Sequence, residues 1–182
     1  GHLIWNVNYE PGILKAIGYR NGRKLITEVE TSDKPNTVIV TPYKTTMLAD
    51  GKDVSVINIS VVDKNGVEVP DANNLIHFSV TGDAKIIGVG NGDPSSHEQD
   101  KFNDTIAQRH LFNGKCQVIV QAGTNISMIH FEAKSDSLYS GATDIHTVHP
   151  GTPHPVSNAD NTFPINKSIQ NPVDKMLGAD IS

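Results

Sequence analysis

The densest group of side chains that could perform chemistry lies between Asn91 and Asp100. Oxygens of Asp93, Glu98 and Asp100 could hold Ca²⁺, and His97 could join a transition-metal site or contact a sugar. The spacing does not follow the ligand order of an EF-hand loop, and His97-Glu98 lacks the second histidine of a helical zinc motif. We therefore interpret the segment as a solvated loop between strands, with a sugar-contact or metal-binding loop as the alternative.

Two aromatic residues near the start of the chain form a second candidate site. Trp5, Val7 and Tyr9 alternate and would share one face of a strand, where the rings could stack on a sugar. Aromatic side chains also contribute much of the apolar area of a core. The pattern therefore favours a core role for Trp5 and leaves Trp5 and Tyr9 as substrate-binding candidates.

The residues that usually carry nucleophilic or acid–base catalysis are not arranged for it. A glycosidase needs two carboxylates facing each other across a sugar, and no local sequence places such a pair. Asp50 and Asp53 flank a glycine in a turn, where aspartate commonly binds the local backbone. Cys116 lies in an apolar run without an activating partner and is expected to be buried. We predict no catalytic residue, no metal site and no cofactor.

Three histidines, His77, His110 and His130, fall in separate apolar runs. Their scattered positions favour separate structural roles over one shared set of ligands.

Composition limits the classes of partner. The 182 residues include 15 Lys and Arg against 20 Asp and Glu, giving a formal net charge of -5, and no basic run occurs. A nucleic-acid partner is therefore not expected, because no basic face is available to displace counterions from phosphates. No apolar stretch approaches the ~20 residues of a membrane span. No signal peptide is recognisable, and the first residues read as the middle of a domain.

Short β-type runs separated by turn residues dominate the chain and predict an all-β fold. Residues 1–35 read as a meander of three strands that ends a preceding β-sandwich domain, with turns at Pro11-Gly12 and Asn21-Gly22. Residues 36–148 contain strands at intervals typical of an immunoglobulin-like antiparallel sandwich. Residues 149–182 are polar and rich in proline, which indicates an extended linker that could enter another domain. The strands expected in the meander span residues 3–9, 13–19 and 24–31, and those expected in the sandwich span 37–41, 54–62, 75–80, 85–89, 107–112, 117–121, 126–133 and 142–148.

Several phrases together resemble a known family. The string from Trp5 to Gly22, with Tyr9, Pro11-Gly12 and Gly18-Tyr19, resembles the last strands of the sandwich that follows the catalytic barrel in bacterial β-galactosidase-like glycoside hydrolases of family 2. The next unit, residues 36–148, resembles the C-terminal immunoglobulin-like domain of that family. The phrases that carry this second resemblance are Leu48–Asp53, Val62–Ala72, Phe78–Gly82, Gly88–Asp93, Phe112–Lys115 and Ala133–Ser135.

The resemblance implies a parent enzyme that hydrolyses terminal β-galactosides or related β-glycosides with two glutamates on a barrel upstream of Gly1. No catalytic residue is carried over onto this chain. The implied role is a non-catalytic module that braces the barrel of the same polypeptide or shapes its cleft, in a periplasmic or extracellular protein. A carbohydrate-binding module for galactoside or galactan, and a surface adhesion domain, remain as alternatives.

The last residues, Leu177–Ser182, resemble the opening strand of a family 53 endo-β-1,4-galactanase barrel. Such a barrel would make pectic galactan the expected substrate.

Overall fold

A computed structural model describes residues 4–152, so the proline-rich region from residue 153 onward and the galactanase-like tail lie outside the described residues. Within that range the chain divides between Thr31 and Ser32 into two compact units. Every regular element in the described part of the chain is a strand, which confirms the all-β prediction. No helix suited to crossing a membrane occurs in this range.

The first unit is built on a hairpin of β1 (Ile13–Arg20) and β2 (Arg23–Glu30). The strands pair antiparallel and are joined by Asn21 and Gly22, whose φ angles are 49° and 75°. Two consecutive positive φ angles define a type I′ turn, which matches the twist of the strands that it connects. The turn predicted from Asn21-Gly22 is therefore confirmed.

The strand expected over residues 3–9 is wrong for the residues described. Residues 4–10 form no strand and pair with no other segment of the described chain. Alternation of side chains does not form a strand by itself, because the backbone groups of a strand need a neighbour for their hydrogen bonds. The meander is thus a hairpin preceded by an irregular segment.

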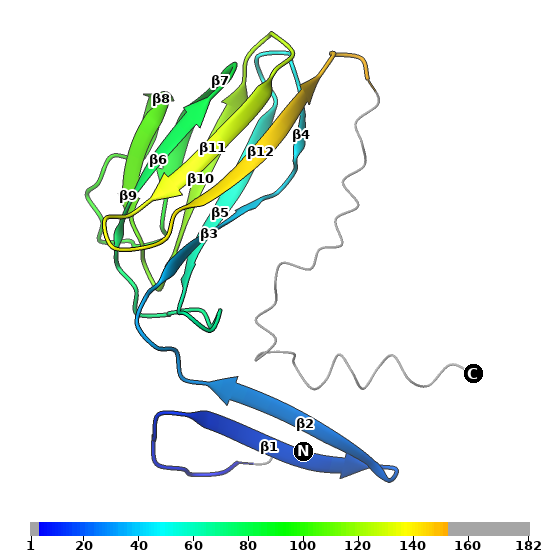
Figure 1. Cartoon of the computed structure of the whole chain (residues 1–182), viewed down its shortest axis with the longest axis vertical. Coiled ribbons are helices and arrows are strands. Elements are labelled where there is room, and N and C mark those ends of the chain that lie inside the picture. The colour runs from blue at the N-terminus through cyan, green and yellow to red at the C-terminus, as the bar shows by residue number, and fades with distance from the viewer. Residues whose placement is uncertain (1–3, 153–182) are drawn as a thin grey trace. The chain divides into compact units, whose positions relative to one another are not determined.

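The second unit is a sandwich of two five-stranded sheets, one in front of the other in Figure 1. Within these two sheets the strands pair antiparallel, except for β4 with β12, which pair parallel. The first sheet has the order β3 (Thr37–Pro42), β5 (Val54–Val62), β10 (Lys115–Ala122), β7 (Ala84–Gly90), β8 (Lys101–Asp104). The second has the order β4 (Thr46–Leu48), β12 (Gly141–Val148), β11 (Met128–Lys134), β6 (Leu75–Thr81), β9 (Ile106–His110).

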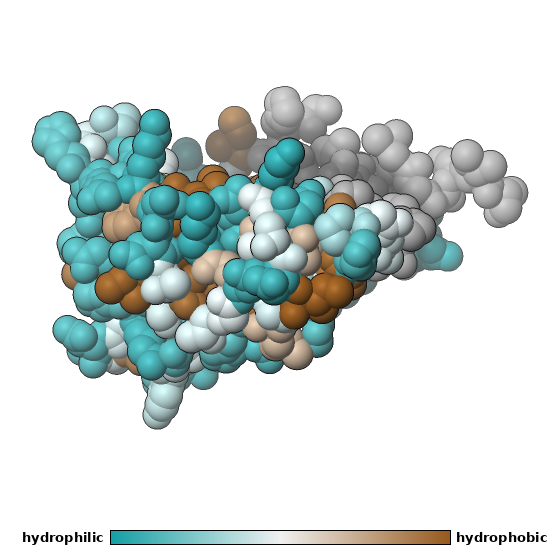
Figure 2. Space-filling model, turned by 90° about the horizontal axis from the view of Figure 1, so that it is seen from above, coloured by the Kyte–Doolittle hydropathy of each residue, from teal (hydrophilic) through white to brown (hydrophobic). Residues whose placement is uncertain are grey.

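The core lies between the two sheets. In β5 every second side chain points inward, so that Ile57, Ile59 and Val61 are buried, as the alternation of the sequence predicts. From the facing sheet, the rings of Phe78 and Phe131 stack with centroids 6.0 Å apart. These apolar side chains supply the main driving force for the fold of this unit. Seen from above, the exterior is mostly hydrophilic with separate apolar areas (Figure 2).

Cys116 lies on β10 with 3% of its surface exposed, as expected of a lone cysteine in an apolar run. Burial raises the pKa of its thiol to about 12. The thiolate is the reactive form of cysteine, so this side chain is a core residue and not a nucleophile at neutral pH.

Candidate functional site

The loop Asn91–Asp100 is held in place by a single buried arginine. Arg109 lies on β9 and points into the sandwich, with 4% of its side chain exposed. Its Nη2 donates to Asn91 Oδ1 at 3.1 Å, and its Nη1 donates to Asp100 Oδ1 at 2.5 Å and to the Glu98 carbonyl at 3.3 Å. The guanidinium therefore binds the loop at both ends, and the loop is an ordered part of the sandwich.

Glu98 links the same loop to the neighbouring residue on β9. Its Oε1 lies 2.8 Å from His110 Nδ1, and its Oε2 lies 3.6 Å from Arg109 Nε. That Nε is the one buried side-chain nitrogen or oxygen without a hydrogen bond among the residues described. Desolvation raises the pKa of Glu98, but hydrogen bonds from His110 and the positive charges nearby outweigh it, so the net shift is downward. Glu98 is thus a structural carboxylate in an ion-pair network.

The other two candidates in this loop do not converge on a ligand. Asp93 Oδ1 accepts hydrogen bonds from the amide and hydroxyl of Ser95 at 2.8 and 2.7 Å, which lower the pKa of Asp93. His97 is exposed. Within residues 4–152 no three histidine, cysteine or acidic side chains lie close enough to hold a metal ion. The arrangement fits the interpretation of this segment as an inter-strand loop.

Trp5 and Tyr9 lie in the irregular segment before β1, in the other unit. Their exposed fractions are 67% and 78%. The core role favoured for Trp5 is therefore wrong for the residues described, because no strand carries this segment into a core. Both rings are accessible for stacking.

The hairpin itself exposes apolar side chains on both faces. Leu14, Leu25 and Val29 share one face, and Ile17 and Ile26 lie opposite each other on the other. A two-stranded sheet is marginally stable in water without a further layer or further strands. Exposed apolar surface of this kind is typical of an interaction surface.

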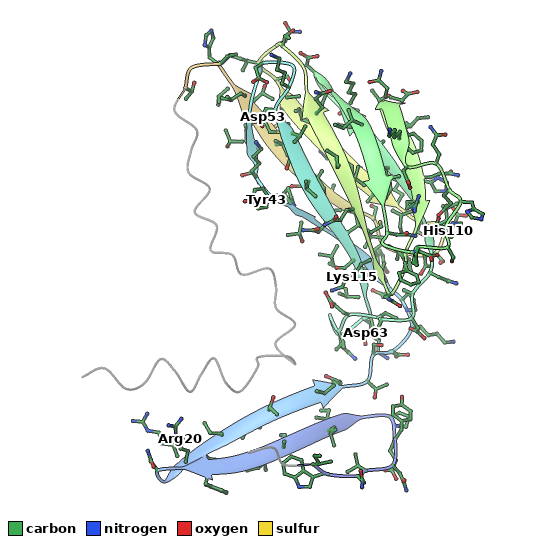
Figure 3. The ribbon with its side chains drawn as sticks, turned by 180° about the vertical axis from the view of Figure 1, so that it is seen from behind. Arg20, Tyr43, Asp53, Asp63, His110 and Lys115 are labelled. Carbon is green, nitrogen blue, oxygen red and sulfur yellow. The ribbon has the colours of Figure 1, made fainter. Side chains whose placement is uncertain are left out.

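Two aspartates stabilise opposite ends of the sandwich (Figure 3). Asp53, at one end, accepts the amides of Leu48 and Val54 at 2.8 Å and pairs with the Lys44 ammonium. At the other end, the buried Asp63 accepts three backbone amides. Asp50 accepts the amides of Lys52 and Asp53, which confirms the turn role predicted for this pair.

Sequence reasoning did not single out Arg109, and it treated Asp63 only as the start of a turn. The inward position of Arg109 could have been predicted from the sequence. Arg109 alternates with Ala107 and Leu111, and these two apolar residues are buried on the same side of the segment. A charged residue at an inward position predicts a buried partner. Asp63 precedes Asn65-Gly66, and an aspartate at the start of a turn commonly binds the amide two residues on.

The fold places this chain among immunoglobulin-like β-sandwich domains, and comparison with protein families makes the assignment specific. The family model described as glycoside hydrolase family 2 C-terminal domain 5 matches residues 38–144, which are most of the sandwich. A second model, described as a domain of unknown function (DUF4982), matches residues 1–26. The chain belongs to glycoside hydrolase family 2 and corresponds to the C-terminal region of such proteins.

Similar proteins support the same assignment. The chain is 38% identical over 139 residues to the β-galactosidase BoGH2A of Bacteroides ovatus, covering 75% of this chain and 16% of that protein. The crystal structure of a glycosyl hydrolase family 2 member from Bacteroides cellulosilyticus superposes with a TM-score of 0.71 at 33% identity, covering 79% of this chain and 19% of that one. A β-glycosidase structure from Bacteroides vulgatus gives 0.68 at 29% identity, covering 79% and 18%. The chain therefore spans less than a fifth of the length of these relatives.

Proposed function

We propose that this chain is a non-catalytic accessory module of a family 2 glycoside hydrolase whose catalytic barrel hydrolyses terminal β-galactosides or related β-glycosides. The observation that carries the proposal is the family match across the sandwich, in a chain covering 16% of its β-galactosidase relative. The contacts of three of the described acidic residues support it. Asp53, Asp63 and Glu98 are engaged by backbone amides or cationic side chains and are not free for acid–base work.

The hairpin supports a bracing role for the module. Its apolar faces would be covered by neighbouring strands or by the barrel of the same polypeptide, and burial of such surface contributes about 25 cal/mol per Å². In this role the module stabilises the catalytic domain without contacting substrate. The family resemblance also leads us to place the parent protein in the periplasm or outside the cell, which cell fractionation would test.

A charged residue on the hairpin tests the bracing role in the full-length enzyme. Leu25→Asp should lower the melting temperature of the catalytic domain by several degrees, because a carboxylate would be buried in the interface. The matched control is Ile106→Asp on β9, where 63% of the side chain is exposed and little change is expected. Equal effects of the two variants, or hydrolysis of a β-galactoside by the 182-residue chain alone, would contradict the proposal.

The exposure of Trp5 and Tyr9 favours carbohydrate binding as the second candidate function. In this case the 182-residue chain should bind galactose, lactose or galactan in a calorimetric titration. Trp5→Ala should abolish the heat of binding. The control is Tyr139→Ala, which removes an equally exposed ring from the sandwich. If the unmodified chain binds none of these sugars, carbohydrate binding is contradicted and the bracing role is the candidate that is left.

A further inference from the structure

Four histidines share the outer face of the sheet β4-β12-β11-β6-β9. On β11 the buried side chains of Ile129 and Phe131 point into the core, so His130 between them points outward. The same alternation turns one exposed histidine outward on each of the neighbouring strands. The histidine stripe formed in this way consists of His146 on β12, His130 on β11, His77 on β6 and His110 on β9.

The strand register arranges the stripe as a diagonal line across the sheet. His146 lies opposite Met128, which is two residues before His130 on β11. His77 lies opposite Lys134, which is four residues after His130. His110 pairs with Leu75, which lies two residues beyond His77 in the same direction. Three strand spacings and eight residue positions give a stripe about 30 Å long.

The net charge of the surface around the stripe depends on whether the four imidazoles are protonated. On β11 and β12 they are Lys134, which pairs with Glu132 at 2.8 Å, and Asp144, which lies 2.6 Å from His130 Nδ1. On the β9 side Glu98 lies 2.8 Å from His110 and 3.6 Å from Arg109, which also pairs with Asp100. The facing residues of β4 and β6 carry no further charge. Two cationic side chains, Lys134 and Arg109, against four carboxylates leave the surface acidic when the imidazoles are neutral. Four protonated imidazoles reverse that sign.

We propose that the histidine stripe binds a linear anionic polysaccharide, such as a polyuronate, when its imidazoles are protonated. Histidine is the side chain that ordinarily changes charge between about pH 5 and 8. A narrow line about 30 Å long suits an extended chain with regularly spaced carboxylates better than a compact protein. Protein interfaces also need an apolar centre, whereas the large exposed apolar side chains on this face, Met128 and Ile106, lie on separate strands. The stripe contains no aromatic ring besides the imidazoles, so recognition rests on charge.

Binding of polygalacturonate to the 182-residue chain tests the proposal. At low ionic strength, affinity electrophoresis should show binding at about pH 5.5 that weakens at least about tenfold at about pH 7.5. Dextran, a neutral polysaccharide, should not bind at either pH. Added salt should weaken the binding, because exposed charges are screened.

Paired variants locate the binding surface. H77Q/H130Q should remove most of the pH-dependent binding, while H97Q/H149Q removes two described histidines that lie off the stripe and should retain it. Thermal melting establishes that each variant is folded, and the pH comparison on the unmodified chain stands without any variant. Binding that is independent of pH, equal losses in the two double variants, equal retardation by dextran, or equally tight binding of a compact acidic protein would each overturn the proposal.

Discussion

Asp63→Ala should lower the free energy of unfolding of the sandwich by about 3 kcal/mol. Only 3% of Asp63 is exposed, and its carboxylate accepts the amides of Asp33, Asn65 and Val67 at 2.8 to 2.9 Å. These contacts join the segment before β3 to the turn after β5. Truncation removes the common acceptor of the three amides, and urea denaturation at neutral pH measures the loss of stability.

Two further variants distinguish the effect of the acceptor oxygens of Asp63 from the effect of its side-chain volume. Asp63→Asn keeps the size of the side chain but replaces one acceptor oxygen with a donor, so we expect it to lose about half as much stability. Asp136→Ala removes an exposed aspartate from the loop before β12 and should change stability by no more than about 0.5 kcal/mol. A similarly small effect of Asp63→Ala would contradict the anchoring role.

The same residue predicts a dependence of stability on pH. Burial alone would raise the pKa of Asp63, but the amides of Asp33, Val67 and Asn65 outweigh it and hold that pKa below its ordinary value. A carboxyl with a lowered folded-state pKa stabilises the protein above its unfolded pKa of about 3.9 and loses this contribution as pH falls through the folded-state pKa. The difference in stability between the unmodified chain and Asp63→Asn should therefore be constant near neutrality and shrink below about pH 4.

The strands of the sandwich core could be predicted because local sequence determines which side chains are buried. The nine residues of β5 alternate without interruption, and the prediction of residues 54–62 matches the structure. β4 and β8 were missed because they have three and four residues. β4 is defined by parallel pairing with β12, a contact that depends on the tertiary fold and has no local signal.

The organisation of the candidate site needed the tertiary structure. The sequence showed that Asp93, His97 and Glu98 are close along the chain. It did not show that Arg109 would bind this loop through hydrogen bonds. The histidines were interpreted as scattered because strand order was unknown. Once β12, β11, β6 and β9 are placed side by side, residues far apart in sequence form one line without forming a shared ligand set among the described residues. Alternation predicts which face a residue occupies, whereas neighbours on that face depend on register.

Arg109→Met should lower the free energy of unfolding by about 2.5 kcal/mol and release the loop Asn91–Asp100. Methionine fills the space of the arginine stem, so the loss comes mainly from hydrogen bonds. Asn91 Oδ1 and the Glu98 carbonyl would lose their donor. Asp100 is 69% exposed and can be hydrated instead, so its charge adds little to the cost.

Hydrogen exchange distinguishes a clamp from a residue that only fills space. The amide of His110 lies 3.4 Å from the Glu98 carboxylate, so release of the loop should speed its exchange together with that of the loop amides. The matched control is Gln108→Met, at the residue that precedes Arg109 on β9 and faces outward. This variant should leave the exchange rates of the loop amides unchanged. Arg109→Lys keeps the charge but lacks the fork that reaches Asn91 and Asp100 together, so it should recover only part of the stability. If Arg109→Met destabilises the protein without faster exchange in the loop, the arginine contributes to packing alone. If both change, this inward arginine is what orders the loop.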